Sequence, residues 1–196
     1  MRLTTVSAFS TLVAFLLAAP QTWAGQGAPV YVTAYGGTAL NNSIEQLPWP
    51  FDWRAYDSKL AGIGISRELA RSADGSLGFE TEAMAMRHWG DQRLWEAVAL
   101  GMVRWHNLPW NTHLNSTLGA GAGVSHVSKI SVIEQARNAK QARTIGYLGF
   151  EATAAPKSAE DWQGVLRWHH RSGGYGTFNG VKGGSNYLLL GVRRTF

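Results

Sequence analysis

The chain is dominated by segments of about ten residues in which apolar and polar side chains alternate. Alternation of this kind places the two sorts of side chain on opposite faces of a β-strand. We identify eight segments, separated by clusters of turn-forming residues, at 29–36, 58–70, 76–87, 94–105, 113–126, 142–153, 161–171 and 185–196. An even count allows closure with both termini at one end. The sequence therefore predicts an all-β fold, an eight-stranded antiparallel transmembrane β-barrel of the bacterial outer membrane.

The fourth segment shows the alternation most clearly. One face carries Trp95, Ala97, Ala99, Gly101, Val103 and Trp105, whereas Glu96 and Arg104 lie on the other. At ~3.3 Å per residue and a tilt of ~40°, the separation of the two tryptophans projects to about 25 Å, the height between the aromatic girdles of a membrane barrel. We expect the apolar face to contact lipid.

Charged residues fall on the opposite faces of several segments. They are Glu68, Glu80, Glu82, Glu96, Glu151, Arg104, Arg167 and Arg193. In a narrow barrel little water fits inside, so these groups must pair with one another. A set of catalytic carboxylates is the alternative, but the alternation already accounts for their positions.

The first residues have the pattern of an export signal. Arg2 precedes an apolar stretch that ends at Pro20, and residues 22–24 resemble a signal-peptidase site. We predict a signal peptide over residues 1–24 and a barrel over residues 25–196. The apolar stretch is shorter than the ~20 residues that a membrane-spanning helix needs.

Composition narrows the possible functions. The absence of cysteine excludes disulfides and thiolate chemistry. The net charge of +5 suits an anionic partner such as lipopolysaccharide, but it is too small and dispersed to indicate nucleic-acid binding. His88, His106, His113 and His126 lack the spacing of metal ligands, and we interpret them as girdle or loop residues.

Loop lengths and the C-terminus indicate an orientation. Connections after the second, fourth and sixth segments are short, which is typical of periplasmic turns, and most of the others are longer. The terminal Phe196 resembles the signal that the barrel assembly machinery recognises in outer-membrane proteins. The alternative architecture, a soluble sandwich or lipocalin-like barrel, would expose the tryptophan-rich face to water.

A possible catalytic pair occurs at the end of the seventh segment. His170 and Ser172 continue the lipid-facing side that carries Trp162 and Trp168. At i and i+2 of a strand they point the same way, so the imidazole could activate the hydroxyl for acyl transfer. Polar residues at headgroup level would give the same pattern without catalysis.

The run of residues 168–173, Trp-His-His-Arg-Ser-Gly, followed by a loop and a last strand, resembles the C-terminal motif of the PagL family. The resemblance implies an outer-membrane lipid A 3-O-deacylase, with His170 as base and Ser172 as nucleophile, and no cofactor or metal. Two features depart from the family. Its asparagine after the serine is Gly173 here, and its acidic residue is missing, since no Asp or Glu follows Asp161.

Asn186 is the nearest substitute for the missing acid. It lies on the lipid-facing side of the last segment and could orient His170 by a hydrogen bond, although a neutral amide stabilises the imidazolium less than a carboxylate would. The predicted site therefore comprises His170, Ser172 and Asn186, with Gly173 and Gly174 around the oxyanion or substrate.

Three functions are compatible with these residues. The first is a hydrolase that removes an ester-linked acyl chain from lipid A. The second is a non-enzymatic barrel that stabilises the outer membrane or binds lipopolysaccharide. The third is another modification of lipid A, for instance oxidative. A pore is disfavoured because eight strands enclose only enough space for side chains.

Overall fold

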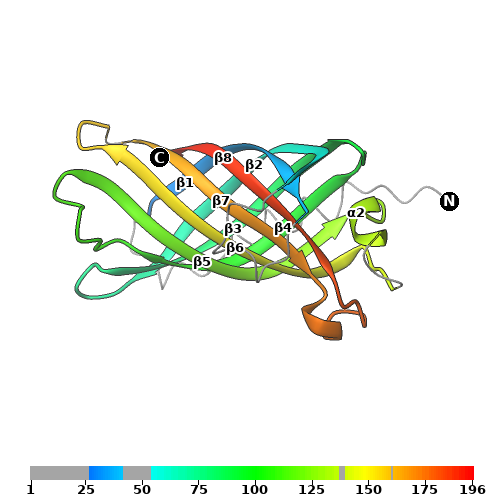
Figure 1. Ribbon diagram of the computed structural model, residues 1–196. Helices are drawn as coiled ribbons and strands as arrows, with labels where there is room; N and C mark the ends of the chain where they lie inside the picture. The colour runs from blue at the N-terminus through cyan, green and yellow to red at the C-terminus, as the bar shows by residue number, and fades with distance from the viewer. Residues whose placement is uncertain (1–26, 42–53, 137–139, 160) are drawn as a thin grey trace.

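A computed structural model describes residues 27–41, 54–136, 140–159 and 161–196 of this chain. The strands are β1 (Val30–Leu40), β2 (Ala55–Arg71), β3 (Leu77–Gly90), β4 (Trp95–Trp105), β5 (Leu114–Val127), β6 (Thr144–Pro156), β7 (Trp162–Ser172) and β8 (Gly184–Thr195). Each strand pairs antiparallel with the next, and β8 pairs with β1, so the eight strands form a closed barrel (Figure 1). The predicted eight strands and their closure are confirmed.

Among the described residues, two short helical segments lie between strands, α2 (Val132–Gln135) and the 3-10 turn η3 (Gly174–Gly176). Within the described ranges, no helix combines the length and the apolar character needed to cross a bilayer. The predicted signal peptide, residues 1–24, lies outside the described residues and stays a prediction.

The two faces of the sheet carry the side chains that the alternation predicted. Trp95, Val103 and Trp105 of β4 are exposed on the outside of the barrel, while Glu96 and Arg104 are buried inside it. Exposed apolar side chains cover the outer wall on other strands as well, for example Ile63 and Leu190. The interior combines buried ion pairs with a cluster of apolar side chains such as Met84, Leu100 and Tyr187. Since the charged groups are inside and the exterior is apolar, the protein has the arrangement of a barrel that is solvated by lipid.

The middle of the barrel is filled by a central ion cluster, which consists of Glu80, Glu82, Glu151, Arg104, Arg167 and Arg193. Glu151 accepts hydrogen bonds from Arg104 (2.7 Å) and Arg167 (2.7 Å). Glu80 accepts from Arg104 (2.9 Å), and Glu82 accepts from Arg167 (2.6 Å). Three carboxylates thus compensate three guanidinium groups, which confirms that the charged residues are paired in the interior.

One histidine was placed wrongly by the sequence analysis. His88 is an interior residue rather than a girdle or loop residue, and its Nε2 lies 2.8 Å from Glu96 Oε2. The strand β3 continues to Gly90, so His88 keeps the inward side that begins at Glu80. His126 lies on the outer face of β5, where its ring contacts the Thr144 hydroxyl, and His106 lies in the connection after β4.

The first strand is longer than predicted. It runs on from Gly36 to Leu40, which brings Leu40 opposite Asn186 of β8. The residues Gly36 and Gly37 resemble a turn in the sequence, but a Cβ atom at Gly37 would lie 2.0 Å from the carbonyl oxygen of Leu188. Glycine therefore permits close contact between two strands here instead of ending one.

The two ends of the barrel differ. The segments α2 and η3 lie at one end, and the C-terminus lies at the other (Figure 1). Phe196 exchanges backbone hydrogen bonds with Val30 at the start of β1. The end with α2 and η3 carries the longer connections, so in a membrane barrel it corresponds to the extracellular end.

The turn between β2 and β3 gives a pH prediction. Oδ1 of Asp74 accepts hydrogen bonds from the Ser72 hydroxyl (2.6 Å), the Ser76 amide (3.1 Å) and the Ser76 hydroxyl (2.9 Å). These bonds, that from Ser72 first, lower the pKa of Asp74 to about 2. Because this pKa lies below that of an unfolded Asp, about 3.9, the turn should be fully stabilised above about pH 4 and lose this contribution as the pH falls through 2. NMR titration of the carboxyl group measures it, and a midpoint near 4 would contradict the prediction.

Candidate active site on the outer wall

His170 and Asn186 lie directly opposite each other on β7 and β8. The Nδ1 atom of His170 is 2.5 Å from Oδ1 of Asn186. Both side chains are on the outward side of their strands, yet only 7% of His170 and 2% of Asn186 are exposed. The structure thus brings together two of the predicted site residues.

The partner atom fixes the role of each imidazole nitrogen. An amide oxygen can only accept a hydrogen bond, so Nδ1 of His170 carries the proton and donates a hydrogen bond to Oδ1 of Asn186. In the neutral ring Nε2 is then unprotonated. Asn186 therefore holds the tautomer in which Nε2 can act as a base.

Ser172 occupies the last position of β7, on the same side of the strand as His170. Its Oγ accepts a hydrogen bond from the Gly174 amide (3.0 Å). Among the described residues, no hydrogen bond joins Ser172 to His170. The two side chains are neighbours along one strand face, and a rotation of either is needed to bring Oγ and Nε2 together; such bonds often tighten only when substrate binds.

Glycines surround Ser172 on both neighbouring strands. Gly146 of β6 and Gly184 of β8 are its register partners. The ring of Phe178 lies over Gly146, because a Cβ atom there would be 2.7 Å from Phe178 Cε2. The sequence analysis missed these residues; the outward position of Gly146 in the sixth segment was the one signal that the sequence offered.

The predicted oxyanion residues differ in the amides that they offer. The Gly173 amide donates to the Gly183 carbonyl (2.9 Å) and so belongs to the hairpin between β7 and β8. The Gly174 amide points at Ser172 Oγ. Of the two, Gly174 is therefore the donor that lies next to the Ser172 oxygen, beside which the carbonyl oxygen of an attacked ester would become the oxyanion.

On the inner side of β7, Glu96 contacts the two residues next to His170 in the chain. His169 Nε2 lies 3.1 Å from Glu96 Oε1, and Arg171 Nε lies 3.7 Å from it. His169 and Arg171 flank His170 and point into the barrel, as predicted for His169. Their contacts fix the strand on which the candidate base stands.

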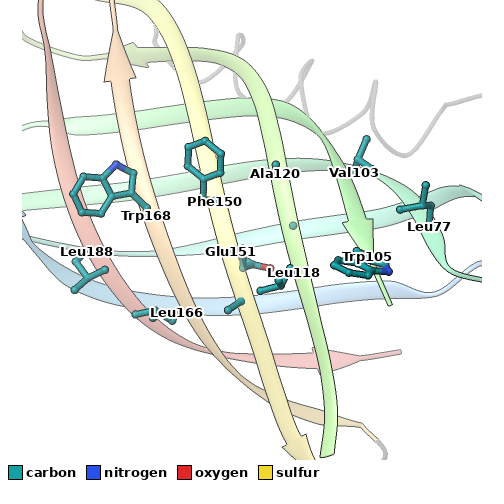
Figure 2. Close-up of a pocket in the computed structure, with 12 residues that line it drawn as sticks. Leu77, Val103, Trp105, Leu118, Ala120, Phe150, Glu151, Leu166, Trp168 and Leu188 are labelled. Carbon is teal, nitrogen blue, oxygen red and sulfur yellow. The ribbon is translucent and has the colours of Figure 1, made fainter. Parts of the chain in front are cut away.

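An apolar groove lies on the outer wall (Figure 2), and its lining stops short of His170, Ser172 and Asn186. It has a volume of about 540 Å³, and its lining includes Val103, Ala120, Phe150, Trp168 and Leu188. Trp168 precedes His170 by two positions, and Leu188 follows Asn186 by two, each on the same strand face. The groove thus ends one outward position short of His170 and Asn186, and it extends along the wall toward Trp105 and Leu77 near the opposite end.

In the described part of the chain, no group of three or more His, Asp or Glu side chains is arranged to hold a metal ion.

Comparisons with known proteins give the fold. No protein-family model matches the chain, and no curated protein matches its sequence. The N-terminal β-barrel domain of Pseudomonas aeruginosa OprF is similar in structure, with a TM-score of 0.51 and 12% identity over 86% of this chain and 98% of that domain. Neisserial surface protein A (NspA) is also similar in structure, with a TM-score of 0.50 and 13% identity over 85% of this chain and 97% of that chain. At identities this low, the structural similarity shows a shared outer-membrane barrel fold and nothing finer. The resemblance to PagL stays a prediction.

Proposed function

We propose that this protein lies in the outer membrane and removes an ester-linked acyl chain from lipid A. The observation that carries the proposal is the hydrogen bond between His170 and Asn186 on the outer wall, on the same strand face as Ser172. These groups belong to the end of β7 and the start of β8, which lie at the end of the barrel that carries the longer loops (Figure 1). An outer-leaflet ester would reach them from the membrane, without entering the barrel.

Membrane insertion is supported by the apolar outer wall and the sealed, ionic interior. The predicted signal peptide and the terminal aromatic residue suit export and assembly by the barrel assembly machinery. Phe196 is exposed at the end of the chain, where such a machinery could bind it. Lipid and lipopolysaccharide are the partners in this proposal, and nucleic acid is not among them.

The proposed reaction proceeds by acyl transfer. Nε2 of His170 takes the proton of the Ser172 hydroxyl as Oγ attacks the ester carbonyl. The tetrahedral intermediate collapses when the bond to the sugar oxygen breaks, and the imidazolium returns its proton to that oxygen. Water, deprotonated by His170, then attacks the acyl-serine and releases a fatty acid. The Gly174 amide is available to donate to the oxyanion in both steps.

The apolar groove supports an acyl substrate. Its apolar lining includes Trp168 and Phe150 and lies on the membrane-facing wall (Figure 2), beginning one outward position from His170 on β7. A chain bound there would place its ester at the level of His170. We therefore expect hydrolysis to require a long acyl chain, since the binding energy of that chain positions the carbonyl.

Lipid A from cells that express the protein tests the function. Mass spectrometry should show a species that lacks one acyl chain, together with the corresponding free fatty acid. Cells with the empty vector provide the control. Unchanged lipid A masses at a verified level of folded protein in the outer membrane would reject the proposal.

The neutral partner of His170 leads to a prediction of increased activity. Replacing Asn186 with aspartate supplies the anion that is missing, which stabilises the imidazolium formed during attack. We expect kcat to rise about 10-fold to 100-fold, because the tautomer is already set in the native protein and only the charge is gained. Asn186→Ala, which removes the acceptor, should fall below the native rate. The order Asp, Asn, Ala in kcat is the expected result; equal rates for all three would show that residue 186 does not act on His170.

A non-enzymatic barrel is the second candidate. It is favoured by the hydrogen bond that Ser172 Oγ already accepts from Gly174, in place of one with His170. In that case the outer-wall residues would serve to hold the hairpin, and lipid A would keep its mass.

A further inference from the structure

The connections β5–β6 and β7–β8 carry exposed basic side chains without exposed acids. Lys129, Lys140, Arg143 and Lys182 are exposed, and the described residues 128–136, 140–143 and 173–183 contain no exposed Asp or Glu. Glu134 is the acidic residue of these stretches, but it is buried, 3.1 Å from Arg171 and bonded to Ser185 (2.9 Å). Within the described residues of these two connections, no exposed carboxylate therefore compensates the positive charge.

Three of these cations come from loops that touch each other. Nζ of Lys140 lies against Gly180, at 2.6 Å from the position of a Cβ atom there. Nδ2 of Asn179 donates to the carbonyl of Thr144, next to Arg143 (2.9 Å). Lys182 follows Gly180 by two residues in the same connection. The two connections thus form one basic surface, the loop cation cluster, made of Lys140, Arg143 and Lys182.

The loop cation cluster is adjacent to the candidate site. Gly183, the neighbour of Lys182, accepts the hydrogen bond of the Gly173 amide beside Ser172. Arg171 of β7 donates to the carbonyl of Arg143 (3.2 Å). A molecule bound to the cluster would therefore lie beside the hydroxyl of Ser172.

The hairpin that carries part of the cluster also has aromatic residues suited to a lipid interface. Figure 1 shows the β7–β8 connection with η3 extending away from the strands. Tyr175 at its tip is 82% exposed, although its φ of 54° is uncommon for a residue other than glycine. An exposed tyrosine next to lysines is typical of the headgroup level of a membrane.

We propose that the loop cation cluster binds a phosphate group on the headgroup of an outer-leaflet lipid. Uncompensated ammonium and guanidinium groups bind phosphate oxygens through charge-assisted hydrogen bonds. The inference rests on the proposed function in one respect, since a bound phosphate would determine which ester of the same lipid reaches Ser172. The substrate class is then a phosphorylated acyl ester, and an uncharged ester would be held less tightly.

The test measures lipid binding by the Ser172→Ala protein, so that no turnover occurs. The full chain, purified in a zwitterionic detergent, is titrated with phosphatidic acid, with phosphatidylcholine and with inorganic phosphate, and bound lipid is counted by native mass spectrometry. The triple variant Lys140→Gln/Arg143→Gln/Lys182→Gln should bind phosphatidic acid about 100-fold more weakly, at roughly a factor of five for each lost charge. The control Arg54→Gln/Lys59→Gln/Arg93→Gln removes the same charge from the same end and should change binding less than about threefold.

Three outcomes would overturn the inference: equal losses in the two triple variants, equal affinity of the Ser172→Ala protein for phosphatidylcholine, or saturation by inorganic phosphate alone. Gel mobility before and after heating confirms that each variant is a folded barrel. If binding fails while lipid A is still deacylated, the inference is wrong and the proposed function stands. If binding is found but no acyl chain is lost, the proposed function is wrong and the inference stands.

Discussion

Replacing Ser172 with alanine should eliminate the loss of an acyl chain from lipid A. The variant lacks the oxygen that attacks the ester, while His170 and Asn186 keep their hydrogen bond because neither depends on the Ser172 hydroxyl. We expect the rate to fall at least about 10³-fold, since the groups of such a site act as a unit. His170→Ala should give a loss of similar size. Mass spectrometry of lipid A, or release of fatty acid by purified protein in mixed micelles, measures both.

Thr144→Ala is the matched control for this experiment. Thr144 presents a hydroxyl on the exposed side of β6, two positions from the register partner of Ser172, and it contacts His126 rather than His170. Its loss should leave the rate within about a factor of two, as for surface substitutions that touch no part of the site. Full activity of Ser172→Ala would show that another group is the nucleophile or that the protein uses a different chemistry.

Replacing Glu151 with glutamine should strongly destabilise the barrel. Its Oε1 accepts from Arg104 at 2.7 Å, its Oε2 accepts from Arg167 at 2.7 Å, and Arg193 lies 3.5 Å from Oε1. The substitution keeps the shape of the side chain but leaves the central ion cluster with two carboxylates for three guanidinium groups. A buried charge without a partner costs about 3–5 kcal/mol. Urea unfolding of the protein folded into phospholipid vesicles measures the free energy of unfolding.

Glu68→Gln provides the comparison for the interior substitution. Glu68 pairs with Arg71, whose side chain is partly exposed at the end of β2, so water can solvate the arginine that remains. We expect a loss below about 1 kcal/mol there. Similar free energies for Glu151→Gln and the native protein would mean that water solvates the interior arginines, in which case the barrel is less tightly sealed than its burial implies.

Local alternation was sufficient to predict the strands and their two faces. Successive residues of a strand point their side chains to opposite faces of the sheet. Local sequence alone therefore predicts that Trp95 faces lipid and that Glu96 faces the interior. Closure followed because an even number of paired strands leaves no edge unsatisfied in lipid. The pattern also placed His170, Ser172 and Asn186 on the outward side, and the structure agrees with that placement.

Distances across strands were beyond the sequence. The alternation could not reveal that His88 and His169 meet at Glu96, because those three residues come from three strands. It did not give the packing of Phe178 over Gly146 or the contact of Lys140 with Gly180, both of which depend on how loops fold back. The missing hydrogen bond between Ser172 and His170 also could not be foreseen, since side-chain rotation and the Gly174 amide decide it.

The sequence by itself thus determined the number of strands, the side of the wall on which most residues of the predicted segments lie, and the pairing of charged groups inside the barrel. These properties follow from the period of a β-strand and from the solvent on each side. Only the tertiary structure decided which groups touch. The register between strands sets the His170–Asn186 pair, the neighbours of Glu151 and the meeting of the two basic loops, and register arises from pairing along the whole closed sheet rather than from any single segment.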